Sequence, residues 1–281
     1  MADPLAPDRH RQRDFFVADI LDAVPKDDLG TMEHPMFALR AGDRRVRRYE
    51  HKDSSIEIQP GAKGLATQND KDILIYCISQ LVAAINRGRE PSRVVQLTAY
   101  DLLVSTNRRT DGDAYMRLQE ALDRLRGTTV STNIRTGDTR TREGFGLIDS
   151  YRIVERDGQE RMAALEITLS QWLYRAVESM QVLSISRDYF RLRKPLERRL
   201  YEISRKHCGA QPSWRASLAT LHLKSGSSAS LKRFRQHIIE AAESDHLPDY
   251  RMQYDRAQDL VTIYSRSPKG ALKQIQKSLQ L

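Results

Sequence analysis

Hydroxyl, basic and amide side chains gather between residues 227 and 236, where their types suit DNA contact. A helix that buries Leu231, Phe234 and Ile238 turns its basic residues outward or to its margin. Hydroxyls and free backbone amides at a helix start suit phosphate, and arginine and glutamine make bidentate contacts with guanine and adenine. The alternative is a solvated basic face. The candidate DNA-binding residues are Ser227, Ser228, Ser230, Lys232, Arg233, Arg235 and Gln236.

A second candidate set surrounds an expected helix from Asp113 to Arg126, in which Leu118 and Leu122 point inward. Recognition helices contact bases through their N-terminal residues, while flanking cations hold phosphates. Acidic residues on the same outer face oppose close phosphate contact, so packing or dimerisation is the alternative. The candidates are Arg108, Arg109, Tyr115, Arg117 and Gln119, with Arg140 and Arg142 in a basic turn further along the chain.

The residue patterns of common catalytic and metal sites do not occur in the sequence. The run Gly61-Ala62-Lys63-Gly64 lacks the spacing of a phosphate-binding P-loop, and there is no Gly-x-Ser-x-Gly motif. None of the seven histidines forms a His-x-His or His-x-x-x-His pair. We therefore expect a protein that is not an enzyme and that needs neither a metal nor a cofactor.

Two successive helices and a hairpin are expected to position the candidate residues between Arg108 and Arg142. A short helix at 97–104 and a polar break at 106–112 precede the helix from Asp113 to Arg126, which Gly127 should stop in a left-handed cap. β-Branched residues then lead through the basic turn at 135–142 and back towards Tyr151. Helix, turn, helix and a hairpin with a charged tip is the order of a winged helix-turn-helix.

The same order recurs nearer the C-terminus. A short helix containing Trp214, Leu218 and Leu221 precedes a turn, a second helix from Leu231 and a hairpin over residues 250–264. A long basic helix at 187–207, kinked or restarted by Pro195, connects the two parts. The sequence therefore predicts an α+β fold with two winged helix-turn-helix domains in tandem joined by a basic helix.

Further elements complete the predicted domains. The N-terminal domain spans residues 14–169 and the C-terminal domain spans 170–266, between a disordered tail at 1–13 and a tail at 267–281. The expected elements outside the two repeats are a helix at 15–24, short strands at 36–39, 46–49 and 56–59, a core helix at 71–87, a hairpin turn at 157–158 and a helix at 171–178.

Charge and cysteine content narrow the class of protein. The excess of 46 lysines and arginines over 37 acidic residues gives a net charge of +9 and a pI near 9.6, which favours nucleic acid as partner. Cys77 and Cys208 lie far apart, the N-terminus has no apolar signal segment, and no stretch is long enough to span a membrane. These features predict a protein of a reducing cytoplasm without membrane contact.

Several stretches carry a resemblance to a known family. They are Ala121–Val130, Thr132–Ile134, Gly146–Ile148, Gly226–Ser228, Leu231–Phe234 and Leu247–Tyr250. The chain resembles plasmid replication initiators of the replication initiator protein A type from about Phe15 to Tyr264. The resemblance implies binding to repeated sites at a replication origin and recruitment of host initiator and helicase proteins. It also implies dimerisation through the first domain and reading of DNA mainly through the second.

The sequence thus predicts a plasmid initiator that binds repeated double-stranded DNA sites and promotes origin opening. Arg233 and Gln236 are expected to carry sequence preference, and Arg142 to carry phosphate contact. Two alternatives stay open. A winged-helix repressor, acting on its own gene, makes the same contacts, whereas a single-strand binder needs aromatic residues along a groove. Only 7% of the residues are aromatic, which disfavours the second alternative.

Overall fold

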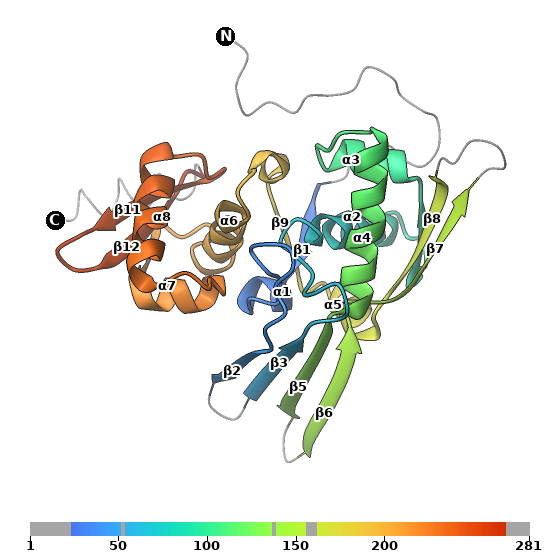
Figure 1. The fold of residues 1–281 in the computed structure, drawn as a ribbon, viewed down its shortest axis with the longest axis horizontal. Helices are drawn as coiled ribbons and strands as arrows, with labels where there is room; N and C mark the ends of the chain where they lie inside the picture. Colours follow the sequence, from blue (N-terminus) through green and yellow to red (C-terminus); the bar gives the residue numbers. More distant parts are fainter. Residues whose placement is uncertain (1–23, 52–53, 137–138, 156–161, 268–281) are drawn as a thin grey trace, which may run out of the picture. The chain divides into compact units, whose positions relative to one another are not determined.

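The computed structural model describes residues 24–51, 54–136, 139–155 and 162–267 (Figure 1). The chain divides into two compact units. Unit 1 comprises the chain up to Asp28 together with Met36–Ser184, and unit 2 comprises Leu29–Pro35 and the chain from Ile185 onwards. The predicted tails, the helix at 15–24 and the turn at 157–158 lie wholly or almost wholly outside the described residues.

The boundary between the units differs from the predicted one after residue 169. Helix α5 (Gln171–Glu178) buries Leu173 and Val177 in the core of unit 1. Strand β9 (Val182–Ser184) pairs with β1 (Lys26–Asp28) in the same unit. Because these elements pack within unit 1, the boundary follows Ser184.

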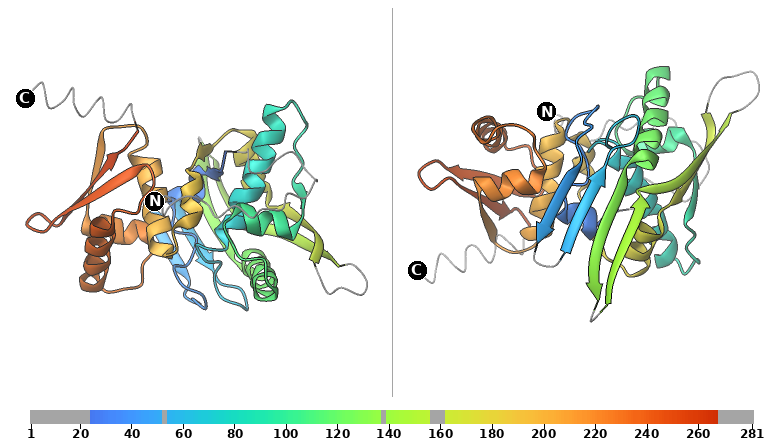
Figure 2. Two further views of the ribbon diagram at one scale, coloured as in Figure 1. Left: turned by 90° about the horizontal axis from the view of Figure 1, so that it is seen from above. Right: turned by 60° about the horizontal axis from the view of Figure 1, so that its bottom comes forward.

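Unit 1 packs helices against antiparallel sheets, one ordered β2-β3-β5-β6 and another ordered β4-β8-β7 (Figure 2). Its further helices are α2 (Lys71–Asn86), α3 (Ala99–Ser105) and α4 (Gly112–Gly127). Its further strands are β2 (Arg47–His51), β3 (Ser54–Gln59), β4 (Val94–Leu97), β5 (Thr129–Thr136), β6 (Thr139–Gly146), β7 (Ile148–Glu155) and β8 (Met162–Leu169). Helix α2 is buried along most of its length and lies in the core, as its wide apolar face predicts.

The predicted pair of helices in unit 1 is confirmed, with a different role for Gly127. Thr98 caps α3 and Asp111 caps α4, because their side-chain oxygens accept backbone N–H groups at 3.1 and 3.0 Å. Gly127 is not in the left-handed conformation. A Cβ added at Gly61 would lie 2.7 Å from the Gly127 Cα, so the two glycines allow close backbone packing.

The basic hairpin does not complete the helix pair in the predicted way. Strand β5 pairs with β3 on one side and with β6 on the other, so Arg135, Arg140 and Arg142 belong to the four-stranded sheet (Figure 2). The hairpin that pairs with β4, the strand preceding α3, is β7–β8. Gly146 lies where the chain passes from one sheet to the other, and a Cβ there would approach the Ile148 carbonyl to 2.7 Å.

The predicted strand at 36–39 is wrong, whereas the two that follow it are confirmed. Ala38 makes an isolated bridge to Thr67, and residues 36–38 are buried in the core of unit 1. Their apolar character therefore reflects burial of a loop. Strands β2 and β3 pair antiparallel, with Arg47 opposite Ile58.

Unit 2 contains a second set of helices and a three-stranded sheet ordered β10-β12-β11. Its helices are α1 (Leu29–Glu33), a 3-10 helix (Arg187–Arg191), α6 (Pro195–His207), α7 (Leu218–Ser225) and α8 (Leu231–Ser244). Its strands are β10 (Ser213–Ser217), β11 (Tyr250–Asp255) and β12 (Leu260–Ser265). Pro195 restarts the helix as its first residue. Trp214 lies in β10 and not in a helix, because it pairs with Ile263 in the sheet.

The predicted basic connecting helix is a buried helix of unit 2. Arg199 has a relative exposure of 1% and donates to the carbonyls of Thr31 and Met32, each at 3.0 Å. It also pairs with the buried Glu202 at 3.1 Å. Arg198 is buried as well and donates to the Leu192 carbonyl at 2.7 Å. These arginines hold the unit together and are not a solvated basic face.

The two units repeat one arrangement. A helix, a strand, two helices and a hairpin follow one another in each, as α2-β4-α3-α4-β7-β8 in unit 1 and α6-β10-α7-α8-β11-β12 in unit 2. In both, the first strand pairs with the last strand of the hairpin. In unit 1, strands β5 and β6 are inserted in the chain between α4 and the hairpin β7–β8, and they belong to the four-stranded sheet. None of the described helices is both long and apolar enough to cross a membrane.

Candidate nucleic-acid interface

The first two turns of α8 present a set of exposed polar and basic side chains. Ser230 caps the helix by accepting the Arg233 N–H at 3.3 Å. Phe234 and Ile238 are buried, and Lys232, Arg233 and Gln236 are exposed, as the helical spacing predicts. The predicted burial of Leu231 is wrong, because its side chain is 37% exposed at the start of the helix. Within the described part of the chain, neither Lys232 nor Arg233 has an ion-pair partner. Their charges are therefore available to a ligand.

Arg235 contacts the hairpin of unit 2. Its guanidinium pairs with Asp259 at 3.0 Å and donates to the Tyr254 hydroxyl at 2.9 Å. Asp259 precedes β12 and Tyr254 lies in β11. This side chain thus links α8 to the hairpin, and its contact with DNA stays a prediction.

The serines at the start of α8 have local roles of different kinds. The Ser227 hydroxyl accepts the Ala229 N–H at 3.2 Å, which stabilises the turn after α7. Ser230 caps α8, and Ser228 is exposed. The helix start thus combines an exposed hydroxyl, backbone amides and two cations, which is a favourable site for an anion.

The candidates of unit 1 are largely held by neighbouring acids. Arg108 pairs with the fully buried Asp72 at 2.8 Å and donates to the Asn69 carbonyl, so it anchors α3 and α4 to α2. Arg109 is 87% exposed but pairs with Asp111 at 2.6 Å. Arg117 is 74% exposed and lies 4.0 Å from Asp113. These pairs reduce the positive field of α4.

The remaining unit 1 candidates lie in three places. Tyr115 is half-buried and packs against the core, whereas Gln119 is exposed on α4. Arg140 and Arg142 lie on β6, opposite Arg135 and Asn133 of β5. They therefore belong to the four-stranded sheet and not to the hairpin that joins β4.

The C-terminal half of α4 serves packing within unit 1. Asp123 accepts from Lys63 at 2.7 Å and from the Tyr151 hydroxyl. Burial raises the pKa of Asp123, but these hydrogen bonds outweigh it and lower the pKa overall. Arg124 binds Asp70 through two bonds of 2.7 and 2.9 Å. The acidic residues that opposed phosphate contact in the sequence are thus partly neutralised.

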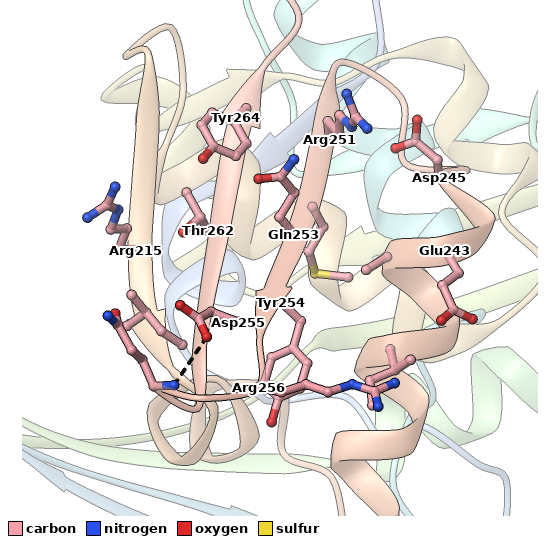
Figure 3. A pocket seen from close by; sticks show the side chains of 15 residues that line it. Arg215, Glu243, Asp245, Arg251, Gln253, Tyr254, Asp255, Arg256, Thr262 and Tyr264 are labelled. Carbon is pink, nitrogen blue, oxygen red and sulfur yellow. Dashed lines mark hydrogen bonds between the residues drawn. The ribbon is translucent and has the colours of Figure 1, made fainter.

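Unit 2 also contains a groove of about 890 Å³ beside the outer face of its sheet (Figure 3). Arg215, Arg251 and Arg256 line it, and none has an ion-pair partner within the described residues. Two of its acids are occupied: Asp245 pairs with Arg266 at 2.6 Å, and Asp255 accepts backbone N–H groups of the hairpin turn. The lining thus contains three arginines and, with Glu243, three acids, of which Asp245 is ion-paired outside the groove lining.

Sequence reasoning missed these three arginines, although a signal was present. Arg251, Gln253 and Asp255 alternate along β11 with buried or half-buried residues, which is the pattern of a strand with one solvated face. In the sheet, Arg251 lies opposite Tyr264, and Thr262 lies between Gln253 and Arg215. The pairing of β10 with β12, which brings Arg215 to this face, is not visible in a local pattern.

Known proteins similar to this chain point to one family. The chain matches the family described as replication initiator protein A over residues 26–252. It is 40% identical over 258 residues to a curated protein of Wigglesworthia glossinidia brevipalpis whose name refers to replication, and the match covers 90% of this chain and 94% of that protein. These two matches agree over most of the chain.

Solved structures show a similar fold. A crystal structure of domains 2 and 3 of RctB has a TM-score of 0.62 at 11% identity, covering 90% of this chain and all 100% of the other. A second structure of the same domains has a TM-score of 0.59, also at 11% identity, covering 86% and 98%. At this identity the likeness concerns the fold alone.

Proposed function

The chain belongs to the replication initiator protein A family, and from that premise we propose that it initiates plasmid replication by binding repeated double-stranded DNA sites at the origin. It acts without catalysis of its own, in the bacterial cytoplasm. Binding strains the duplex locally and promotes opening, and the bound protein recruits host initiator and helicase proteins. The sequence patterns support a non-enzymatic role, because they contain no common catalytic motif.

Both units are winged helix-turn-helix domains in this proposal. The repeated order of elements, with the first strand pairing with the last strand of the hairpin, supports it. By that assignment α4 and α8 are the recognition helices, and the hairpins β7–β8 and β11–β12 are the wings. The wing of unit 1 therefore differs from the hairpin expected in the sequence.

Sequence preference resides in α8. The observation that carries this part of the proposal is the exposure of Lys232 and Arg233 without ion-pair partners in the described chain, beside the exposed Gln236. Arg233 and Gln236 have the donors needed for guanine and adenine edges, and Lys232 suits phosphate. Non-specific affinity comes from phosphate contacts, including those of Arg215, Arg251 and Arg256, and depends on salt.

Unit 1 contributes phosphate contacts and dimerisation. Its α4 carries exposed residues of mixed character, Met116, Arg117 and Gln119, next to acids that weaken attraction to phosphate. An exposed methionine at 62% relative exposure suits a protein contact better than a DNA backbone. Homodimers formed through this unit place two copies of α8 on neighbouring origin repeats.

Footprinting on the DNA that flanks the gene tests the proposal. Arg233→Ala and Gln236→Ala should relax sequence preference, because each removes donors to base edges. The matched control is Arg175→Ala, which removes one exposed positive charge from α5 in unit 1. A plasmid that depends on this protein must also stop replicating with the α8 variants. Unchanged footprints and replication would show that α8 does not read the origin.

A further inference from the structure

Strand β4 forms an unpaired edge of its sheet beside a small pocket in unit 1. The sheet order β4-β8-β7 leaves one side of β4 without a neighbouring strand among the described residues. A cavity of about 190 Å³ lies between this strand and the C-terminal half of α2. Its lining includes Tyr76, Gln80, Leu81, Ala84, Val95 and Leu97. The cavity is smaller than pockets for drug-sized ligands, which are roughly 300–1,000 Å³, and suits one or two side chains.

The backbone of β4 points hydrogen-bonding groups along this edge. The Leu169 N–H donates to the Arg93 carbonyl at 2.9 Å, so Arg93, Val95 and Leu97 direct their peptide groups towards β8. The peptide groups of Val94 and Gln96 consequently face away from β8. The Val94 N–H donates to the Ser92 hydroxyl at 3.1 Å. The N–H and carbonyl of Gln96 are thus placed to pair with an added strand.

Two polar side chains at the pocket, those of Tyr76 and Gln80, present hydrogen-bond donors. The Tyr76 hydroxyl and the Gln80 Nε2 are buried without hydrogen-bond partners in the described structure. Tyr76 is only 3% exposed, and burial raises its pKa, so its hydroxyl stays protonated. A buried donor without an acceptor is costly. The pocket therefore calls for an acceptor, such as a carbonyl or a carboxylate.

The mouth of the pocket is basic. Arg87 and Arg89 are exposed pocket residues and have no ion-pair partner within the described part of the chain. The one acid of the lining, Glu90, offsets only one of these two charges. A ligand with negative charge and hydrogen-bond acceptors fits this combination better than a basic or purely apolar one.

We propose that the β4 edge binds an extended acidic peptide segment of another protein as an added strand. The peptide backbone pairs with Gln96, and a small side chain enters the pocket. Its acceptors satisfy Tyr76 and Gln80, and its carboxylates approach Arg87 and Arg89. The inference rests on the proposed recruitment of host proteins and gives that recruitment a surface separate from α8.

A second copy of the chain fits this edge less well. Symmetric pairing of two β4 edges brings the same surface of both copies together. Such a pair would bring the arginines Arg87 and Arg89 of both copies into one interface, in which each pocket supplies a single acid, Glu90. An acidic partner offsets these charges better. Charge complementarity thus selects an acidic partner.

Peptide selection on the intact protein tests the proposal. Random decapeptides displayed on phage are selected on the full chain, and a selected peptide is then labelled for affinity measurement. We expect enrichment of Asp and Glu beside small apolar residues. Tyr76→Phe should weaken the labelled peptide about tenfold, as expected for one lost hydrogen bond to a charged group. Arg87→Glu with Arg89→Glu should abolish binding.

Further variants keep the test decisive. Gln96→Pro removes the N–H that faces away from β8, so it blocks strand addition without removing a backbone hydrogen bond to β8. It also removes the side-chain hydrogen bond from Gln96 to Glu166 of β8, so Gln96→Ala, which loses only that bond, is its control. Arg48→Glu with Arg175→Glu is the matched charge control, since both arginines are exposed in unit 1 and neither lines the pocket. Circular dichroism and binding to origin DNA check that each variant is folded and that α8 still works.

The outcomes separate this inference from the proposed function. Loss of peptide binding in the edge variants, with DNA binding intact, supports the β4 site. Selected peptides without acidic enrichment, or binding that is equal in the edge and control variants, would overturn it. A change of oligomeric state in Gln96→Pro, measured by light scattering, would also overturn it and identify the edge as a contact between copies.

Discussion

Units 1 and 2 repeat one order of helices and strands but use the second helix of the pair differently. In unit 1, the charges of α4 are bound by the unit itself, as in the pairs of Asp123 with Lys63 and of Arg124 with Asp70. In unit 2, Lys232 and Arg233 of α8 are exposed without such partners among the described residues. The arrangement of helices and strands alone therefore does not show which helix contacts DNA bases. That depends on whether the charged side chains of the helix already have partners within the unit.

The two units also hold their hairpins in related ways. In unit 1, Tyr151 of β7 donates to Asp123 of α4. In unit 2, Tyr254 of β11 and Asp259 hold Arg235 of α8. In both, a tyrosine on the first strand of the hairpin takes part in a polar contact with the second helix. This contact fixes the hairpin to the helix. It also engages one polar side chain of the helix that would otherwise be exposed to a ligand.

The largest expected effect concerns the buried ion pair of unit 2. Arg199→Met leaves the buried Glu202 without its guanidinium, and we expect a loss of about 3–5 kcal/mol in the stability of unit 2. The chain has two tryptophans, Trp172 in unit 1 and Trp214 in unit 2. Urea unfolding followed in Trp172→Phe and Trp214→Phe backgrounds reports on each unit separately.

The control for this substitution removes both charges. Arg199→Met with Glu202→Leu should recover part of the lost stability, because no buried carboxylate remains. Arg199→Met could lower the urea midpoint reported by Trp172 as much as the midpoint reported by Trp214. The two units would then not unfold independently, and the effect could not be ascribed to unit 2.

The next effect compares α4 with α8 at corresponding positions of the two helices. Arg233→Ala should cost about 1–3 kcal/mol in binding to the origin repeat and relax preference at one base pair. Arg117→Ala, near the start of α4, should cost less and act equally on all sequences, since Arg117 lies beside Asp113. Titrations with repeat and scrambled duplexes measure both. Equal losses of specificity would mean that both helices read bases.

A smaller effect compares the two hairpin regions. Arg142 lies on β6 of the inserted sheet, and Arg256 lies between β11 and β12 of unit 2. Each change to alanine should weaken binding to all duplexes and reduce the salt slope by about one, as expected for one phosphate contact. Binding measured over a range of salt concentrations tests this. A variant with an unchanged slope excludes its arginine from the phosphate contacts.

The smallest effect is a dependence of unit 2 on pH. Burial lowers the pKa of His34 and of His207 to about 4, below the usual 6.5. The unfolded chain therefore binds more protons between pH 6.5 and 4, and unit 2 loses stability as the pH falls through this range. Burial opposes the ionisation of Glu33, but hydrogen bonds from Lys224 and Lys206 lower its pKa to about 2. A further loss thus follows between pH 4.5 and 2.

Fluorescence of Trp214 measures this pH effect. Trp214 stacks on His207 with ring centroids 4.8 Å apart, so its emission reports on that histidine and on unit 2. His34→Gln and His207→Gln should flatten the loss of stability between pH 6.5 and 4.5, and Glu33→Gln should flatten the loss below pH 4.5. If the fluorescence of Trp172 in unit 1 showed the same pH dependence above pH 4.5, His34 and His207 would not be the cause of the loss of stability.

Much of the helical part of the fold is predictable from sequence. The spacing of Leu118, Ala121, Leu122 and Leu125 and the caps Thr98, Asp111, Ser170 and Ser230 are local patterns, and the structure has the helices where they predict them. The exposed set Lys232, Arg233 and Gln236 follows from the same spacing. Each of these features depends on residues within a few turns of one another.

The features that the sequence did not reveal depend on distant pairings. Strand β5 follows α4 directly, yet it pairs with β3, and the hairpin that joins β4 comes later. Arg235 lies at a helix margin, and only the position of Asp259 shows that it is occupied. The sequence pattern around Arg199 is that of a solvated charge, and only the fold shows that Arg199 donates to the carbonyls of Thr31 and Met32. Charge patterns indicate a ligand only after such internal partners are known.

Helix α1 has a consequence for how the chain folds as it is synthesised. It belongs to unit 2, but Met36–Ser184 must be translated before Arg199, which donates hydrogen bonds to the α1 carbonyls, leaves the ribosome. Unit 1 can thus fold first, before α6, the helix that donates to α1, has been synthesised. Unit 2 has contacts of long sequence separation, which slow folding. A fragment starting at Ile185 would lack α1 and should therefore fold poorly unless a peptide spanning Leu29–Pro35 is supplied with it.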